Sequence, residues 1–167
     1  MVLSISQTGV SVISAQLIAD IRQVYGLDWH GIHGVAHWAR VRHIGLRLAS
    51  QTGANPNVVE IFAFIHDAQR HDDGFDPEHG ERAAHLARKL LGRSLHLNAA
   101  EFDLLIYACQ HHTFGHIEAD LTVQTCWDAD RLDLGRVGIV PRAERLCTAA
   151  AKHPEMLQWA YQRSLRR

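Results

Sequence analysis

The sequence lacks the features of membrane-spanning, secreted and nucleic-acid-binding proteins. No run of about 18 apolar residues occurs in its 167 residues, so no membrane-spanning helix is expected. The formal net charge of −1 gives no basic excess for a nucleic acid or an anionic membrane surface. The opening residues MVLSISQTGVSVISAQ lack the cationic segment that begins a signal peptide. We therefore expect a cytoplasmic protein that binds neither nucleic acid nor membrane.

Cysteine is also scarce, and its placement argues against disulfide bonds. The three cysteines, Cys109, Cys126 and Cys147, are odd in number, widely spaced and set in apolar segments. They are expected to act as small buried hydrophobic residues. Histidine, in contrast, occurs 13 times. This excess is the unusual feature of an otherwise ordinary globular composition, which is 47% hydrophobic and 21% charged.

The chain has no alternating apolar and polar pattern of the length of a β-strand. Glycine, proline and asparagine instead divide it into helical segments with short connections, and NAAE at 98–101 fits a helix capping box. We expect helices over residues 14–25, 35–52, 56–66, 78–92, 99–112, 121–135, 141–151 and 154–166. The sequence therefore predicts an all-α protein, a helical bundle with one domain over residues 1–167.

Histidine and carboxylate side chains interrupt the apolar faces of five predicted helices. In VVEIFAFIHDAQR (58–70), His66 lies four residues after Phe62 on the apolar face, and Asp67 follows it. Burying such an ionisable pair costs several kcal/mol unless a partner neutralises or coordinates it. Imidazole and carboxylate are ligands that Zn, Fe and Mn accept, so five inward-facing examples indicate a metal site. The other residues of this kind are His37, His79, His112 and Asp130.

Two of these assignments have a close rival. His111, on the adjacent stripe of its helix, is the alternative to His112. Asp128, two residues before Asp130 on a more polar face, is the alternative carboxylate. Four further histidines near the predicted site in sequence are not on clear apolar stripes and stay ambiguous: His30, His33, His71 and His116.

The order of these motifs resembles that of the HD superfamily of metal-dependent phosphohydrolases. HGVAHWARV, which contains His37, resembles the first motif of the family, and FIHDAQ resembles the motif for which it is named. ADRLDLG resembles the closing motif, whose aspartate corresponds to Asp130. The resemblance spans roughly residues 33–138. It implies a helical HD-type domain in which His37, His66, Asp67 and Asp130 bind a divalent ion.

Two further segments resemble the additional histidine motifs of superfamily members that bind two metals. These segments are PEHGERAA and QHHTFGH. The resemblance implies that His79 and His112 bind a second ion, with Asp67 bridging, and His116 is a candidate further ligand. The cofactor is then one or two divalent ions, chosen among Fe, Mn, Zn, Mg, Co and Ni.

The residues after the HD pair depart from one branch of the family. Alarmone hydrolases have an acidic pair shortly after HD, whereas HDAQRH places Arg70 and His71 there. Hydrolysis of an alarmone is therefore disfavoured. Arg70 is instead a candidate for contact with a substrate phosphate. Candidate groups for orienting water are Asp72, Asp73 and Asp128, and Arg131 and Arg136 are expected either in salt bridges or at phosphate.

The sequence predicts a metal-dependent phosphohydrolase that acts on a nucleotide or other small phosphoester. Its catalytic residues would be Asp67, Arg70 and Asp128, and its partner a small phosphorylated substrate. Two alternatives stay open: a di-iron oxygenase of the same superfamily, since iron accepts the same ligands, and a nucleotide-binding sensor without turnover. Substrate, metal identity and oligomeric state are not predicted.

Overall fold

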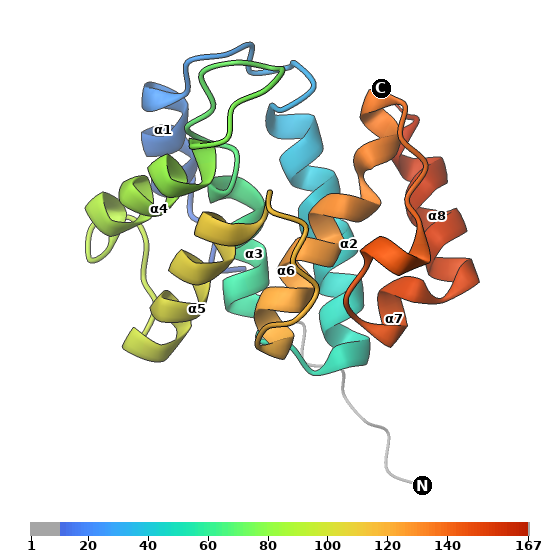
Figure 1. Cartoon of the computed structure of the whole chain (residues 1–167). Helices are drawn as coiled ribbons and strands as arrows, with labels where there is room; N and C mark the ends of the chain where they lie inside the picture. The colour runs from blue at the N-terminus through green and yellow to red at the C-terminus, as the bar shows by residue number, and fades with distance from the viewer. Residues whose placement is uncertain (1–10, 167) are drawn as a thin grey trace, which may run out of the picture.

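The computed structural model describes residues 11–166, and the predicted all-helical fold is confirmed within them (Figure 1). The only β-type pairing in these residues is one isolated bridge between Leu91 and Leu95. The ends of the predicted domain, residues 1 and 167, lie outside the described residues. The helices are α1 (Ala15–Val24), α2 (Val35–Thr52), α3 (Pro56–Ile65), α4 (His79–Leu90), α5 (Ala99–His111), α6 (Leu121–Leu132), the 3-10 turns η1 (Leu134–Val137) and η2 (Ala143–Arg145), α7 (Ala149–Lys152) and α8 (Pro154–Ser164).

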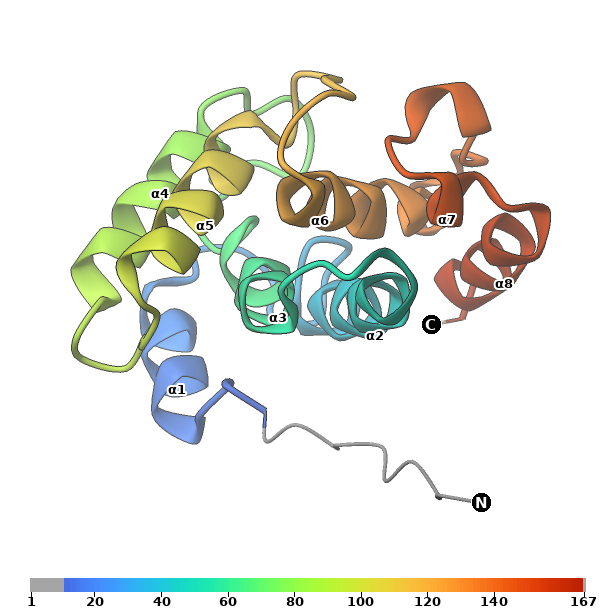
Figure 2. The same cartoon turned by 90° about the horizontal axis from the view of Figure 1, so that it is seen from below.

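Helices α2, α3 and α6 form the centre of the molecule. Both views place α4 and α5 on one side of this centre and α7 and α8 on the other (Figures 1 and 2). The central helices approach closely at Gly45 of α2, where an added Cβ would collide with Val59 of α3 and touch Ala129 of α6. A glycine at this crossing therefore lets three helices share one core.

The core is filled by the apolar faces that the sequence pattern predicted. Ile44 and Leu48 of α2, Phe62 and Ile65 of α3 and Leu105 of α5 are fully buried. Local chemistry fixes several helix ends. Asn98 and Glu101 form the expected capping box of α5, and Gly53 ends α2 with a φ of 80°. The buried faces of α2, α3, α5 and α6 all lead toward the same end of the central helices.

One predicted helix is wrong. Residues 141–151 do not form a continuous helix but a short 3-10 turn, an extended stretch and the single turn of α7. Tertiary contacts account for the difference, because the backbone amides of Cys147 and Thr148 donate to the carboxylate of Asp128 on α6 instead of to a preceding helical turn. Thr148 then caps α7 with its side chain.

No helix in residues 11–166 has the length and hydropathy needed to cross a bilayer.

Candidate metal centre

Four sequence-predicted residues meet at one end of the central helices. His37 comes from the first turn of α2, His66 and Asp67 directly follow α3, and Asp130 is in the last turn of α6. The Nε2 atoms of His37 and His66 are 3.1 Å apart, and Asp130 Oδ1 lies 3.5 and 3.6 Å from them. Asp67 Oδ2 lies at 3.5 and 3.6 Å from the same two nitrogens. We call these four residues the first cluster.

A second cluster, consisting of Asp67, His79 and His112, lies beside the first. His79 is the first residue of α4, and His112 directly follows α5. Their Nε2 atoms are 2.8 Å apart. Gly80 allows this approach, since a Cβ there would collide with the carbonyl oxygen of Cys109 in α5. The sequence-predicted pairing of His79 with His112 therefore depends on a glycine next to one of them.

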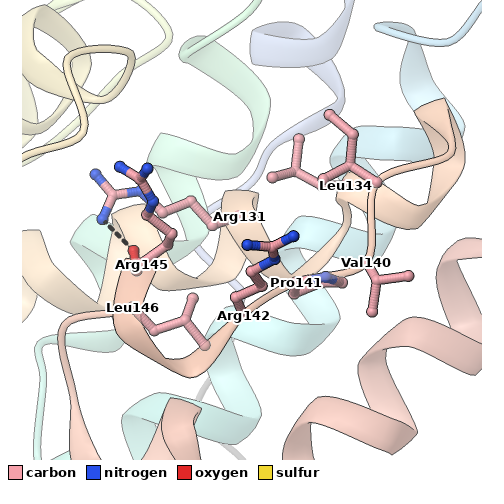
Figure 3. Close-up of a pocket in the computed structure, with 8 residues that line it drawn as sticks. Arg131, Leu134, Val140, Pro141, Arg142, Arg145 and Leu146 are labelled. Atoms are coloured by element: carbon pink, nitrogen blue, oxygen red, sulfur yellow. Dashed lines mark hydrogen bonds between the residues drawn. The ribbon is translucent and has the colours of Figure 1, made fainter.

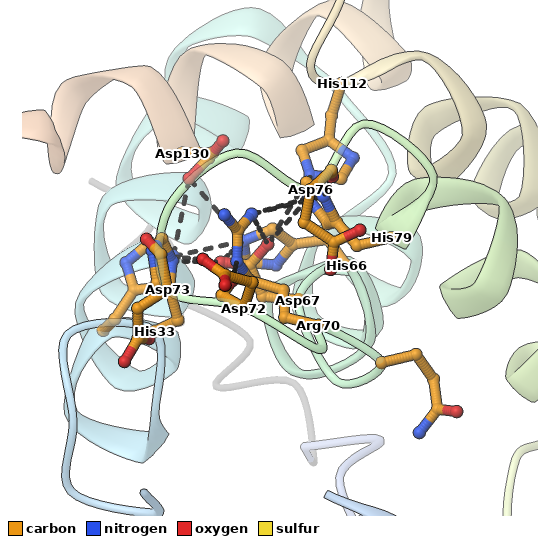
Figure 4. Close-up of polar contacts among 12 residues, drawn as sticks. His33, His66, Asp67, Arg70, Asp72, Asp73, Asp76, His79, His112 and Asp130 are labelled. Atoms are coloured by element: carbon orange, nitrogen blue, oxygen red, sulfur yellow. Dashed lines mark hydrogen bonds and ion pairs between the residues drawn. The ribbon is translucent and has the colours of Figure 1, made fainter. Parts of the chain in front are cut away.

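Asp67 joins the two clusters by dividing its carboxylate between them (Figure 4). Oδ2 faces the first cluster, whereas Oδ1 lies 3.1 Å from His79 Nε2 and 3.7 Å from His112 Nε2. Each half of the carboxylate thus forms a potential three-residue metal site, one with His37 and His66 and the other with His79 and His112.

All four cluster histidines turn Nδ1 outward, toward an acceptor. A carbonyl or carboxylate oxygen can only accept, so each Nδ1 carries the hydrogen and each Nε2 is left with a lone pair. Such outer partners fix the tautomer and orientation of metal-binding imidazoles. The acceptors for His37, His66, His79 and His112 are, in that order, the Asp133 carboxylate and the carbonyl oxygens of Phe62, Asp76 and Cys109.

The buried Nε2 lone pairs therefore face each other in two pairs. Within each pair, the two nitrogen atoms are about as far apart as neighbouring ligands of one metal ion. With metal–nitrogen bonds of about 2.0–2.1 Å, adjacent ligands are about 3 Å apart. The observed separations are 3.1 Å for His37 and His66 and 2.8 Å for His79 and His112. Lone pairs so placed repel each other unless a cation lies between them. The donor set, imidazole with carboxylate, therefore fits divalent metal ions at both clusters.

The electrostatics of the clusters favour a bound cation. Burial alone would raise the pKa of Asp67, but the imidazoles around it, His66 foremost, hold it well below its usual range. The pKa of Asp130 is likewise lowered, against the effect of burial, by His66. Burial opposes protonation of His66, yet the two carboxylates raise its pKa. A proton and a metal ion compete for that nitrogen, and both are attracted by the same two charges.

Both clusters open into a cavity of about 280 Å³ with a cationic wall. Its lining includes cluster residues Asp67, His79, His112 and Asp130, together with Arg70, Arg131 and Arg136. Arginine is suited to bidentate contacts with phosphate or carboxylate. The cavity can therefore accept a small anionic molecule against the clusters.

Comparison with known proteins agrees with this geometry. No family model matches the chain, and no curated protein matches it. Among solved structures, a predicted HD superfamily hydrolase from an uncultured Thermotogales bacterium superposes with a TM-score of 0.67 at 25% identity, over 88% of this chain and 84% of that chain. Together with the converging His and Asp motifs, this likeness supports an HD-type fold and HD-type metal sites in this chain.

The alternatives left open by the HD motifs differ clearly in placement. His112 is buried in the second cluster, whereas His111 is half-buried against the ring of Tyr107. His116 is exposed, with its ring near Trp127, so the structure does not bring it into either cluster. His30 and His71 are also exposed.

The interpretation of Asp128 as a catalytic, water-orienting residue of the HD site needs correction. Its carboxylate is fully buried and accepts hydrogen bonds from the amides of Cys147 and Thr148 and from the Thr148 hydroxyl. Burial raises its pKa, partly offset by these bonds. Asp128 therefore ties the segment before α7 to α6, and Asp130 alone of the two aspartates faces the first cluster.

Asp72 and Asp73 shape the loop at the HD site through their backbone. Their side chains are exposed, while their carbonyl oxygens accept from Arg70 Nε and from His33 Nε2. Their expected role in orienting water is not supported by this placement. Arg70 itself lines the cavity and is 7% exposed.

Two residues at the HD clusters were not predicted from the sequence. His33 Nδ1 lies 3.0 Å from Asp67 Oδ2, and the buried Asp133 accepts from His37 Nδ1 at 2.7 Å. The spacing could have indicated both residues, since His33 is four residues before His37 and Asp133 is three residues after Asp130. Because both precede or follow a helix end, the apolar-stripe pattern does not extend to them.

A second cavity, of about 270 Å³, adjoins the HD site and shares Arg131 and Leu134 with it (Figure 3). Arg131 donates to the carbonyl oxygens of Arg145 and His116. Arg136 donates to the Ile32 carbonyl and forms a 3.9 Å ion pair with Asp133. The rest of the second cavity is lined by Ile139, Val140, Pro141, Arg142, Arg145 and Leu146.

Proposed function

We propose that this protein is a metal-dependent phosphohydrolase of the HD superfamily that acts on a small phosphoester such as a nucleotide. The observation that carries the proposal is the arrangement around Asp67. Each of its two carboxylate oxygens lies beside a pair of imidazole nitrogens with free lone pairs, His37 and His66 on one side and His79 and His112 on the other. A divalent ion bound there would lower the pKa of a water molecule and polarise a phosphoryl oxygen.

The residues of this chain would bind the metal ions and fix the orientation of the imidazole ligands. His37, His66, Asp67 and Asp130 would hold the first ion, and His79 and His112, with Asp67, the second. The four Nδ1 hydrogen bonds keep these imidazoles in the orientation that binding requires. His33, whose Nδ1 lies 3.0 Å from Asp67 Oδ2, would help to hold the Asp67 carboxylate in place.

The cavity walls favour a phosphorylated substrate. Arg70 and Arg136 line the space next to the clusters, where a phosphoryl group would gain two cationic neighbours. The adjoining cavity, with Leu134, Ile139 and Leu146 beside arginines, offers an apolar surface to the organic part of an ester. The likeness to a predicted HD superfamily hydrolase supports hydrolysis as the reaction class.

Metal analysis followed by a substrate panel tests the proposal. Protein purified without added metal would be analysed for Fe, Mn, Zn, Mg, Co and Ni, then assayed with p-nitrophenyl phosphate and with nucleoside mono-, di- and triphosphates. We expect at least one ion per chain and metal-dependent release of phosphate that His66→Ala abolishes. Iron together with oxygen consumption and no phosphate release would establish the oxygenase alternative instead. Tight nucleotide binding without turnover would establish a sensor.

A further inference from the structure

The second cluster already contains a cation, the guanidinium of Arg70. Arg70 Nη1 lies 3.1 Å from His79 Nε2, 3.2 Å from His79 Nδ1 and 3.6 Å from Asp67 Oδ1 (Figure 4). The Nε2 atom of His79 and the Oδ1 atom of Asp67 are the groups that a second metal ion would use. Within residues 11–166, no arginine or lysine forms a comparable ion pair with Asp130 of the first cluster.

Arg70 is anchored in this position from behind. Its Nε donates to the carbonyl oxygen of Asp72 at 3.2 Å, and its Nη2 donates to that of Gly74 at 2.8 Å. The side chain is 9% exposed, so solvent screens its charge only weakly. A guanidinium does not lose its proton in proteins, and its planar fork fits two carbonyl acceptors at once. The second cluster thus has a permanent positive charge held in place by its own loop.

We infer that Arg70 sets the metal stoichiometry of the centre by weakening the second site. The first cluster then fills at low metal concentration, and the second fills only when the ion overcomes the guanidinium. This role rests on the metal centre of the proposed function. It differs from the phosphate contact expected from the sequence, because it acts in the absence of any substrate.

The competing explanation is that Arg70 serves only to fold the loop after the HD pair. Arg82 provides a matched control for that explanation. Its Nε donates to the carbonyl oxygen of Gln69, and its Nη2 pairs with the carboxylate of Asp76, so it anchors the same loop. Within residues 11–166, Arg82 forms no hydrogen bond or ion pair with Asp67, His79 or His112. Removing Arg82 therefore loosens the loop without changing the charge inside the cluster.

The test is a titration of chelator-treated full-length protein with Mn²⁺, following bound metal by elemental analysis and by electron paramagnetic resonance. Two Mn²⁺ ions bridged by one carboxylate are magnetically coupled, so the spectrum reports filling of the second site without any activity assay. Relative to wild type, R70Q should bind the second ion at least about tenfold more tightly, because a like charge beside the second cluster is removed. R70K and R82Q should both resemble wild type.

Each outcome decides between the explanations. Equal second-site affinity in wild type and R70Q, or the same gain in R82Q, would overturn the role of Arg70 while leaving the metal centre intact. No bound ion in wild type at saturating Mn²⁺ would instead overturn the proposed metal centre, and this inference with it. If R70Q does not fold, as judged by circular dichroism, Arg70→Met removes the charge while keeping an unbranched side chain of similar reach, and it is expected to give the same gain.

Discussion

The first and second clusters share Asp67 and both use two histidines, but they differ in charge. The first adds a second carboxylate, Asp130, whose Oδ1 lies 3.5 and 3.6 Å from the two imidazole nitrogens. The second adds the guanidinium of Arg70 instead. We therefore expect two graded cation sites, of which the first attracts a divalent ion more strongly.

Helix ends do not separate the two clusters in the same way. Each cluster has one histidine at a helix N-terminus, His37 of α2 or His79 of α4, and one at a helix C-terminus, His66 after α3 or His112 after α5. We therefore expect any difference in metal affinity to come from the side-chain charges of Asp130 and Arg70, since the numbers of histidines are equal.

The largest expected effect is on the first cluster. Asp130→Ala removes the carboxylate that distinguishes it, and we expect loss of the first ion and of activity. Since changes to outer partners of metal ligands already cost roughly 10–100-fold in affinity or activity, a direct ligand should cost more. Two measurements check this expectation: the metal bound per chain, by elemental analysis after gel filtration, and the release of phosphate. An Asp130→Ala protein that retains its full metal content would remove Asp130 from the centre.

Asp128→Ala is the matched control, two residues away in α6. It should retain metal but lower the free energy of unfolding by about 2–4 kcal/mol, because three buried donors of Cys147 and Thr148 lose their acceptor. Urea denaturation measures this. The reverse pattern, stable protein without metal, would mean that the two aspartates had been assigned the wrong way round.

The fold and most of the centre could be predicted because the information was local and periodic. His37 and His66 stand on apolar faces whose period is that of a helix, so their inward direction followed from the spacing of Val41, Ile44 and Phe62. The choice of His112 over His111 followed in the same way. The contacts that the sequence did not reveal are long-range or lie at helix ends. Nothing local shows that Asp128 accepts from Thr148, twenty residues later, and this contact replaces the helix expected over 141–151. The Arg70 contact with His79 depends on how a loop folds back, which spacing alone does not determine.

A smaller effect is expected at the second cluster. His79→Ala or His112→Ala should lower the metal content at saturating metal from about two ions to about one, while circular dichroism shows the helical fold unchanged. The first cluster keeps all four of its residues, so the first ion should remain. Activity should fall steeply if two ions stabilise the attacking and leaving oxygens. A wild-type protein that never exceeds one ion at saturating metal would show that these histidines contact substrate or support the first site instead.

The smallest expected effect concerns Asp133, the carboxylate behind His37. Asp133 Oδ2 accepts from His37 Nδ1 at 2.7 Å, and Oδ1 accepts from Arg40 Nε at 2.7 Å. Asp133→Asn keeps the shape but removes the negative charge that makes the imidazole a better ligand, so affinity for the first ion should fall by roughly 10–100-fold.

Arg40→Gln separates this effect from a general loosening around Asp133. It breaks the bond between Arg40 and Asp133 but leaves the bond from His37 in place. Metal affinity measured by competition with a chelator should therefore change much less in Arg40→Gln than in Asp133→Asn. Equal losses in the two variants would mean that Asp133 acts by packing α2 against α6, and that the charge behind His37 does not tune the first cluster.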